Sequence, residues 1–189
     1  MGKCINARLS ACMDGQTRLH RFRYHLGRGF VEPDDIVLDI GSGTGYGSHI
    51  LSRVAKKVIG WELEEAEVAG AVKNYQEDNI SYVCANVEAD PLPEVDVACA
   101  FEVIEHLFKP QEFINRLKNS VKRYIIASVP IGERLMEDKQ EVIGDSCHHS
   151  VFANNDVFHN MFVDGKWNLF WTFNCGVTLI SVYYNNDIR

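Results

Sequence analysis

The sequence lacks the cysteine patterns that bind zinc or carry redox chemistry. No C-x-x-C pair occurs in the chain, so neither a zinc knuckle nor a thiol–disulfide motif is indicated. We therefore expect reduced thiols. The six cysteines are scattered along the chain, at Cys4, Cys12, Cys84, Cys99, Cys147 and Cys175.

Long apolar runs and an excess of positive charge are also missing. No run approaches the ~20 apolar residues of a membrane-spanning helix, and residues 1–10 lack the apolar core of a signal peptide. We therefore expect a cytoplasmic protein with no membrane partner. The net charge of −7 disfavours broad contact with a nucleic-acid backbone, and the basic cluster at residues 18–28 is the exception.

The length and composition fit one globular domain. The chain has 189 residues, of which 46% are hydrophobic and 24% are charged, and both fractions are ordinary for a soluble protein. No internal repeat or low-complexity linker divides it. We expect a single domain over residues 1–189, with residues 1–32 as an N-terminal helical cap on a core of residues 33–189.

Hydrophobic patterning predicts strands that alternate with helices, as in an α/β protein. Two runs rich in aromatic and β-branched residues near the C-terminus are joined by residues 174–176, which indicates a closing antiparallel hairpin. The expected strands are residues 36–40, 57–62, 80–85, 95–101, 123–129, 167–173 and 177–184. The expected helices are residues 17–26, 49–54, 64–75, 110–121 and 154–162.

The first of these helices is amphipathic. Leu19, Phe22 and Leu26 recur at helical spacing, so we expect them to form the face that packs on the sheet. Two interpretations remain open. The helix is either a plain cap on the sheet or a lid from which Tyr24 or His20 reaches the functional site.

Glycines alternate after the first expected strand, at Gly41, Gly43 and Gly45. Glycine lets the backbone approach a ligand where a Cβ would clash, and the helix that follows presents free N–H groups to the loop. A dinucleotide fingerprint needs G-x-G-x-x-G, but the sixth position is Tyr46 counted from Gly41 and Ser48 counted from Gly43. A nicotinamide oxidoreductase is therefore disfavoured.

The loop instead reads D-x-G-x-G-x-G from Asp39 and resembles motif I of the class I S-adenosylmethionine (SAM) dependent methyltransferases. The resemblance implies a Rossmann-like α/β fold with a seven-stranded sheet, mostly parallel with a C-terminal antiparallel hairpin, and helices on both faces. It also implies that SAM is the cofactor and that the N-terminal helix lies over it. The expected cofactor-binding residues are Asp39, Gly41, Ser42, Gly43, Gly45, Glu62, Leu63, Asn86, Val87, Phe101 and Glu102.

Two strand ends carry polar groups for the rest of this cofactor. Glu62 ends the second expected strand, where an open α/β sheet places an acid that accepts from both ribose hydroxyls. The alternative is a solvated acid at the start of the next helix. In the family an acidic residue after the third strand bonds the adenine amine. Asn86 stands there, so its carbonyl and the backbone of Val87 are candidates, with Glu88 as a competitor.

An E-x-x-E-H run follows the fourth expected strand. On a helical turn Glu102, Glu105 and His106 share one face and can bind a metal, with His148 or His149 as a fourth ligand. The run is similar to that of metal-assisted O-methyltransferases of the small-RNA 2′-O type and of the ubiquinone pathway. This implies a divalent metal, Mg or Mn, at Glu102, Glu105, His106 and His149. Related E-H-L runs also occur in methyltransferases with no metal, where the histidine is a base or structural.

His106 is the first candidate for a general base, because an unperturbed imidazole pKa of ~6.5 suits proton removal near neutral pH. His148 and His149 come second, and a plain surface loop is the alternative for this adjacent pair. Glu102 and Glu105 complete the expected catalytic set.

Motifs that the sequence lacks limit the chemical class of the methyl acceptor. No N-P-P-Y or D-P-P-Y follows the fourth strand, which disfavours methylation of exocyclic amines of DNA bases, and Cys99 lies inside that strand rather than after a proline. We expect an oxygen acceptor. Because only residues 1–32 and the polar loop at residues 131–150 are free to cover the site, a small-molecule acceptor is favoured. RNA as the acceptor and a catalytically silent SAM-binding partner protein remain alternatives.

Overall fold

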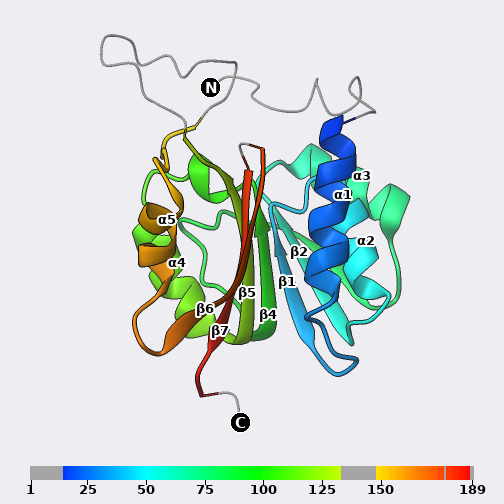
Figure 1. Ribbon diagram of the computed structural model, residues 1–189. Coiled ribbons are helices and arrows are strands. Elements are labelled where there is room, and N and C mark those ends of the chain that lie inside the picture. The colour runs from blue at the N-terminus through cyan, green and yellow to red at the C-terminus, as the bar shows by residue number, and fades with distance from the viewer. Residues whose placement is uncertain (1–14, 133–147, 177, 188–189) are drawn as a thin grey trace.

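The computed structural model describes residues 15–132, 148–176 and 178–187, which form a seven-stranded sheet flanked by helices (Figure 1). The strand order is β3-β2-β1-β4-β5-β7-β6. The strands are β1 (Ile36–Ile40), β2 (Lys57–Glu62), β3 (Ile80–Cys84), β4 (Val95–Phe101), β5 (Val121–Pro130), β6 (Trp167–Cys175) and β7 (Thr178–Asn185). The helices are α1 (Gly15–Arg28), α2 (Tyr46–Ser52), α3 (Glu65–Tyr75), the 3-10 turn η1 (Ile104–His106), α4 (Pro110–Ser120) and α5 (Asn155–Phe162).

The first five strands are parallel, and β7 inserts antiparallel between β5 and β6. The predicted fold class is therefore confirmed, including the C-terminal hairpin. Strand order reverses between β1, which pairs with β2, and β4 on its other side. Ligands of open α/β sheets bind outside the carboxyl ends of the strands at such a reversal. This topology therefore brings the loops after β1 and β4 together at one edge.

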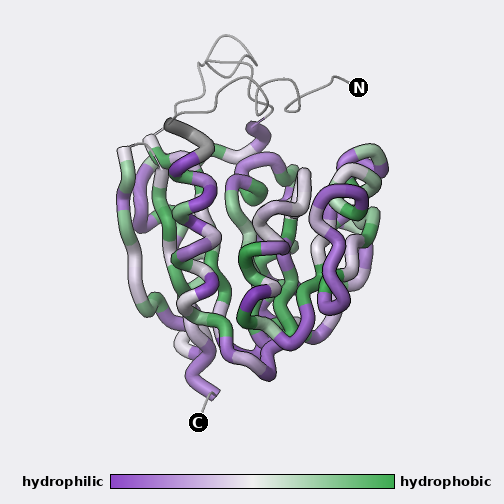
Figure 2. Tube along the Cα trace, turned by 90° about the vertical axis from the view of Figure 1, so that its right-hand side faces the viewer, coloured by the Kyte–Doolittle hydropathy of each residue, from purple (hydrophilic) through white to green (hydrophobic). Residues whose placement is uncertain are grey.

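Two hydrophobic cores lie on opposite faces of the sheet (Figure 1). One face is covered by α4 and α5, where Phe113, Leu117, Phe158 and Phe162 are buried. The other face is covered by α1, α2 and α3. Figure 2 looks onto that second side and shows hydrophobic residues along the strands behind helices whose outer surfaces are mostly hydrophilic. Among the described residues, no helix has both the length and the apolar character required to cross a bilayer.

Helix α1 is present, but one residue of its predicted apolar face lies elsewhere. Phe22, which we expected to face the sheet, is 44% exposed, whereas Arg23 and Tyr24 are buried. The Tyr24 ring packs edge-on against Phe101 with centroids 4.9 Å apart, and its hydroxyl donates to Asp39. A buried polar contact therefore decides the orientation of the helix, and apolar spacing alone did not reveal it.

Element bounds otherwise follow the expected pattern. Helix α2 begins at Tyr46, three residues before the predicted start. Strand β5 begins at Val121, two residues before its predicted start. Pro110 begins α4 as predicted, since proline suits the first helical turn. Of the polar loop predicted at residues 131–150, residues 133–147 lie outside the described residues.

Gly47 permits the contact between α1 and α2. A Cβ built on Gly47 would lie 2.0 Å from Cζ of Tyr24, whereas a Cβ on Gly70, in the middle of α3, would meet no atom within 4 Å. We predict that Gly47→Ala lowers the free energy of unfolding by about 1–3 kcal/mol through overpacking. The matched change Gly70→Ala should raise it by about 0.5–1 kcal/mol, because alanine suits a helix better than glycine. Urea unfolding of both variants measures the difference, and equal effects would contradict the packing of Tyr24 on Gly47.

Candidate functional site

The glycine loop after β1 leaves one position open. Gly41, Gly43 and Gly45 all have left-handed φ values of 69°, 49° and 87°. A Cβ on Gly41 would lie 2.6 Å from Cγ2 of Val103, and one on Gly45 would lie 2.7 Å from the Tyr82 hydroxyl. Around Gly43 the same construction meets nothing within 4 Å. Two of the glycines are therefore required by the protein's own packing, and Gly43 is the one that faces open space.

Hydrogen bonds tie this loop to the end of β2. The backbone amides of Gly41 and Ser42 donate to the Trp61 carbonyl at 2.8 and 2.9 Å. The Gly43 amide donates to Oε2 of Glu62 at 2.9 Å. The loop and the strand-end carboxylate are thus fixed relative to each other before any ligand is present.

Glu62 is oriented by backbone amides on both of its oxygens. Oε1 accepts from the amides of Leu63 at 2.8 Å and Glu64 at 3.2 Å, while Oε2 accepts from Gly43. A carboxylate offers about four acceptor sites, and these three hydrogen bonds leave a free site on Oε2 for a ligand. The Leu63 side chain beside it is 60% exposed, which leaves an apolar surface at the same strand end.

A buried carboxylate lies beneath the loop. Asp39 is fully buried and accepts from the Tyr24 hydroxyl at 3.0 Å and the Ser48 hydroxyl at 2.6 Å. Burial raises the pKa of Asp39 from 3.8 to about 7, against the two hydrogen bonds, which lower it, and the charge of Glu62 raises it further. Asp39 therefore does not itself reach the surface of the loop. It connects β1 to α1 and α2.

The segment after β3 is folded by its own side chains. The Asn86 carbonyl oxygen Oδ1 accepts from the amide of Glu88 at 2.9 Å, and the Asn86 amide donates to Asp90 at 2.7 Å. Glu88 is directed elsewhere, because its Oε1 accepts from the Lys109 amide at 2.9 Å. The backbone carbonyl of Val87 accepts from the guanidinium of Arg116. Asn86 is exposed beside the end of β3 and keeps its side-chain N–H groups for a ligand.

The expectation that Glu102, Glu105 and His106 share one helical face is wrong. Phe101 is the buried last residue of β4, and Glu102, which follows it, has a left-handed φ of 57° and precedes the turn η1. The Glu102 side chain accepts from the Ser128 hydroxyl at 2.9 Å and pairs with Arg23 at 3.3 Å. The left-handed residue redirects the chain, so that Glu102 faces α1 and β5.

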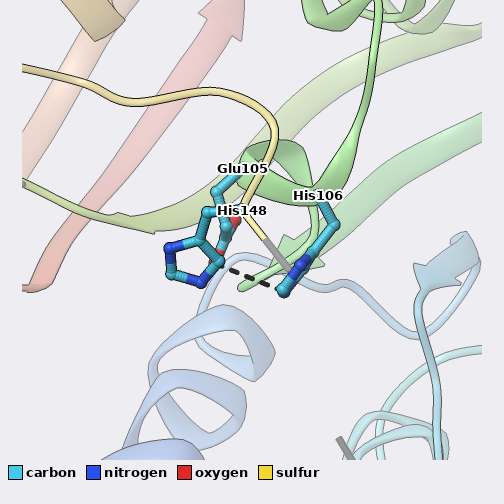
Figure 3. A group of neighbouring side chains, drawn as sticks. All are labelled: Glu105, His106 and His148. Carbon is cyan, nitrogen blue, oxygen red and sulfur yellow. Dashed lines mark ion pairs between the residues drawn. The ribbon is translucent and has the colours of Figure 1, made fainter. Parts of the chain in front are cut away.

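A different group of side chains comes together at η1. Glu105, His106 and His148 offer ligand atoms within 4.8 Å of one another, and Figure 3 shows the two imidazoles beside the Glu105 carboxylate. The Glu105 Oε1 and His106 Nε2 atoms are 4.0 Å apart. His149 lies outside this group, because its ring stacks on Phe108 with centroids 3.9 Å apart. Of the four predicted metal ligands, the structure thus joins Glu105 and His106 with His148 instead of Glu102 and His149.

Backbone hydrogen bonds explain why residue 148 reaches the turn. The amides of His149 and Ser150 both donate to the Glu105 carbonyl, at 2.8 and 2.9 Å. The Ser150 hydroxyl donates to the carbonyl of Leu107 at 3.0 Å. These contacts between segments far apart in sequence could not be derived from the E-x-x-E-H spacing.

Sequence reasoning also missed Ser48, Ser128, Arg23 and Thr178. The two serines bind Asp39 and Glu102, and Arg23 joins Glu102 to Thr178. A serine inside a helix or strand carries no distinctive local signal, and Arg23 is one arginine in a basic cluster. Only the tertiary arrangement separates these residues from their neighbours.

Comparisons with known proteins agree with this fold and loop. Residues 38–124 match a family model described as a methyltransferase domain. A probable S-adenosylmethionine-dependent methyltransferase of Mycolicibacterium smegmatis is 40% identical over 81 residues, which are 42% of this chain and 31% of the relative. A ubiquinone biosynthesis O-methyltransferase of Bradyrhizobium diazoefficiens is 35% identical over 89 residues, which are 46% of this chain and 35% of the relative. The chain thus spans about a third of the length of these curated relatives.

The same fold occurs in solved structures. The N-methyltransferase NodS from Bradyrhizobium japonicum, in complex with S-adenosyl-L-homocysteine (SAH), superimposes with a TM-score of 0.72 over 96% of this chain and 92% of NodS, at 13% identity. The strand order and the superposition define the fold, which is the Rossmann-like fold of methyltransferases. The match to the methyltransferase domain model covers residues 38–124, and this part of the chain is similar in sequence to SAM-dependent methyltransferases.

The raised pKa of Asp39 predicts a pH dependence of stability. The pKa of Asp39 is about 7 in the folded protein and ordinarily 3.8. Between pH ~4 and about pH 7, Asp39 therefore keeps its proton in the folded protein but has lost it in the unfolded chain. The stabilisation is present below ~pH 4 and is lost as the pH rises through about 7, amounting to a few kcal/mol. Asp39→Asn, uncharged at every pH, should therefore gain stability relative to the wild type between about pH 5 and about pH 8.

Urea unfolding across this pH range measures the effect. Asp34→Asn is a matched control, because Asp34 is exposed. Parallel stability profiles for the wild type and Asp39→Asn would show that Asp39 is ionised in the folded protein over the whole range.

Proposed function

We propose that the protein transfers the methyl group of SAM to an oxygen atom of a small-molecule acceptor. The observation that carries this proposal is the open space at Gly43 beside the fixed carboxylate of Glu62. The ubiquinone O-methyltransferase among the relatives supports an oxygen acceptor. The sulfonium of SAM supplies an already activated methyl group, so the protein's task is chiefly to align the reactants and to accept a proton.

The residues present fit the cofactor. The open space at Gly43 would accommodate the amino-acid end of SAM, and Glu62 would accept from the ribose through the free acceptor site of Oε2. Leu63 would contact the adenine ring. At Asn86 the carbonyl is already engaged by Glu88, so its N–H groups are the better candidates for a ring nitrogen of adenine. The remaining proposed contacts are Asp39, through the loop it supports, and Gly41, Ser42, Gly45, Val87, Phe101 and Glu102.

His106 is the proposed base. It lies on η1 directly after β4, and its side chain is partly accessible at 26%. The Glu105 carboxylate, 4.0 Å away and fully buried, would stabilise the imidazolium that forms when His106 accepts the hydroxyl proton of the acceptor. The proximity of His148, with ring centroids 4.9 Å apart, offers a second imidazole to hold or pass on this proton.

A metal-assisted reaction is the second candidate, and the grouping of Glu105, His106 and His148 favours it. One carboxylate and two imidazoles suit Mn²⁺ or Zn²⁺ better than Mg²⁺, which prefers oxygen ligands. A metal held there would lower the pKa of a hydroxyl bound to it. Under this alternative, His106 would bind the metal through a ring nitrogen instead of accepting a proton. The acceptor could then also be the 2′-hydroxyl of an RNA.

Glu62 provides the test of the cofactor site. We predict that Glu62→Ala weakens SAM binding by about 10- to 100-fold, because hydrogen bonds from the ribose to a charged acceptor are lost. Glu65→Ala, at the exposed first residue of α3, is the matched control and should bind SAM like the wild type. Titration calorimetry with SAM, and with NADH for comparison, gives the affinities. Binding of NADH without SAM would refute the proposal.

His106 provides the test of the chemistry. Its replacement by Gln should lower kcat by about 10²- to 10⁴-fold with SAM affinity unchanged, as for loss of a general base. Formation of SAH with a panel of phenols, sugars and short RNAs is the measurement, and His25→Gln on the exposed side of α1 is the control. If EDTA abolishes turnover and Mn²⁺ restores it, the metal-assisted candidate holds. Full activity of a Glu105→Ala, His106→Ala double variant would contradict both, and SAH formation with none of the panel would favour a silent binding protein.

A further inference from the structure

The side chain of Arg23 is buried at the meeting point of three elements. It comes from α1, is 3% exposed, and pairs with Oε1 of Glu102 at 3.3 Å. Its Nη2 also donates to the Thr178 hydroxyl at 3.4 Å. Arg23 thus joins α1 to the end of β4 and the start of β7, at the carboxyl edge of the parallel strands.

The guanidinium of Arg23 keeps unused donors. Both of these contacts are made by Nη2, whereas the buried Nε and Nη1 atoms have no hydrogen-bond partner among the described residues. A guanidinium carries five N–H donors, and buried donors without partners cost free energy. Retaining such a group in the interior is expected where a ligand supplies the missing acceptors.

The charge around Arg23 suits an anion. Helix α1 carries four arginines and no acidic residue, although the whole chain has a net charge of −7. Burial, and then the charge of Arg23, lower the pKa of nearby His20 from 6.5 to about 4. A local positive potential of this kind attracts anionic ligands to the site.

We propose that Arg23 binds a carboxylate group of the methyl acceptor and so restricts the enzyme to acidic acceptors, an inference that rests on the proposed methyl transfer. Adjacent side chains of α1 separate the two halves of the site. Tyr24 reaches Asp39 below the cofactor loop, whereas Arg23 reaches Glu102 and Thr178 on the side of β5 and β7. Glu102 also accepts from Ser128, so Arg23 can share its charge with a second carboxylate.

Benzoate and the neutral analogue benzyl alcohol are the probes, titrated by calorimetry into the SAH-loaded protein. The wild type should bind benzoate and prefer it over benzyl alcohol. Arg23→Met should weaken benzoate binding by about 10- to 100-fold, the effect of losing hydrogen bonds from a charged donor. Arg23→Lys should recover part of the affinity, and Arg21→Met is the matched control, because Arg21 is an exposed arginine of the same helix. The affinity for SAH should be unchanged in all variants.

Two results would overturn the inference. The first is that the wild type binds benzoate no better than benzyl alcohol, or binds neither. The second is that Arg23→Met binds benzoate with the same affinity as the wild type. Weaker binding of SAH with unchanged binding of 5′-methylthioadenosine would instead assign Arg23 to the carboxylate of the cofactor. If the single variant unfolds in a thermal melt, Arg23→Met with Glu102→Gln removes both charges together. Failure of the wild type to bind SAH would refute the proposed function, while benzoate titration of the protein alone would still test Arg23.

Discussion

The buried carboxylate of Asp39 is the constraint on which the cofactor side of this protein depends. An aspartate without access to water is costly, and here two hydroxyls from different helices offset that cost. Tyr24 can reach Asp39 only because Gly47 leaves room for its ring. The same contacts that satisfy Asp39 therefore hold α1 over β4 and orient the start of α2, where the glycine loop ends. Docking of α1 and formation of the loop are two results of one buried polar cluster.

A strained backbone position at Glu102 organises the segment after β4. Glu102 is the one non-glycine residue with positive φ among the residues that the structure describes, and such a conformation costs about 1 kcal/mol or more. It is held by a backbone hydrogen bond to Ser128, by the hydroxyl of the same residue, and by Arg23. The redirected chain then forms η1 and exposes His106. Strain at Glu102 is thus what separates the acidic group near α1 from the imidazoles near residue 148.

These two clusters explain what the sequence could and could not predict. Strand runs, the glycine spacing and Pro110 act locally, and the sheet they predict is the sheet that forms. On α1, the position of Phe22 was predicted wrongly, because Arg23 and Tyr24 are buried with polar partners, which a hydrophobic pattern cannot represent. For the E-x-x-E-H run, a shared face was predicted on the assumption of a regular helical turn, but Glu102 is left-handed. Likewise His148 was preferred over His149 by backbone bonds to Glu105, which no spacing encodes.

The family match covers only some of the residues proposed for the site, so the relatives give little information about the methyl acceptor. The family match spans residues 38–124, which include the glycine loop, Glu62 and His106. Arg23, His148 and Thr178 lie outside it, and Ser128 lies just beyond its end. Residues that hold a shared cofactor face the same chemistry in every member, whereas groups that bind the acceptor are selected by a different molecule in each. Under the proposed function, the residues outside the match that an acceptor would meet are Arg23, which carries a buried charge, and His148, whose imidazole can bind a proton.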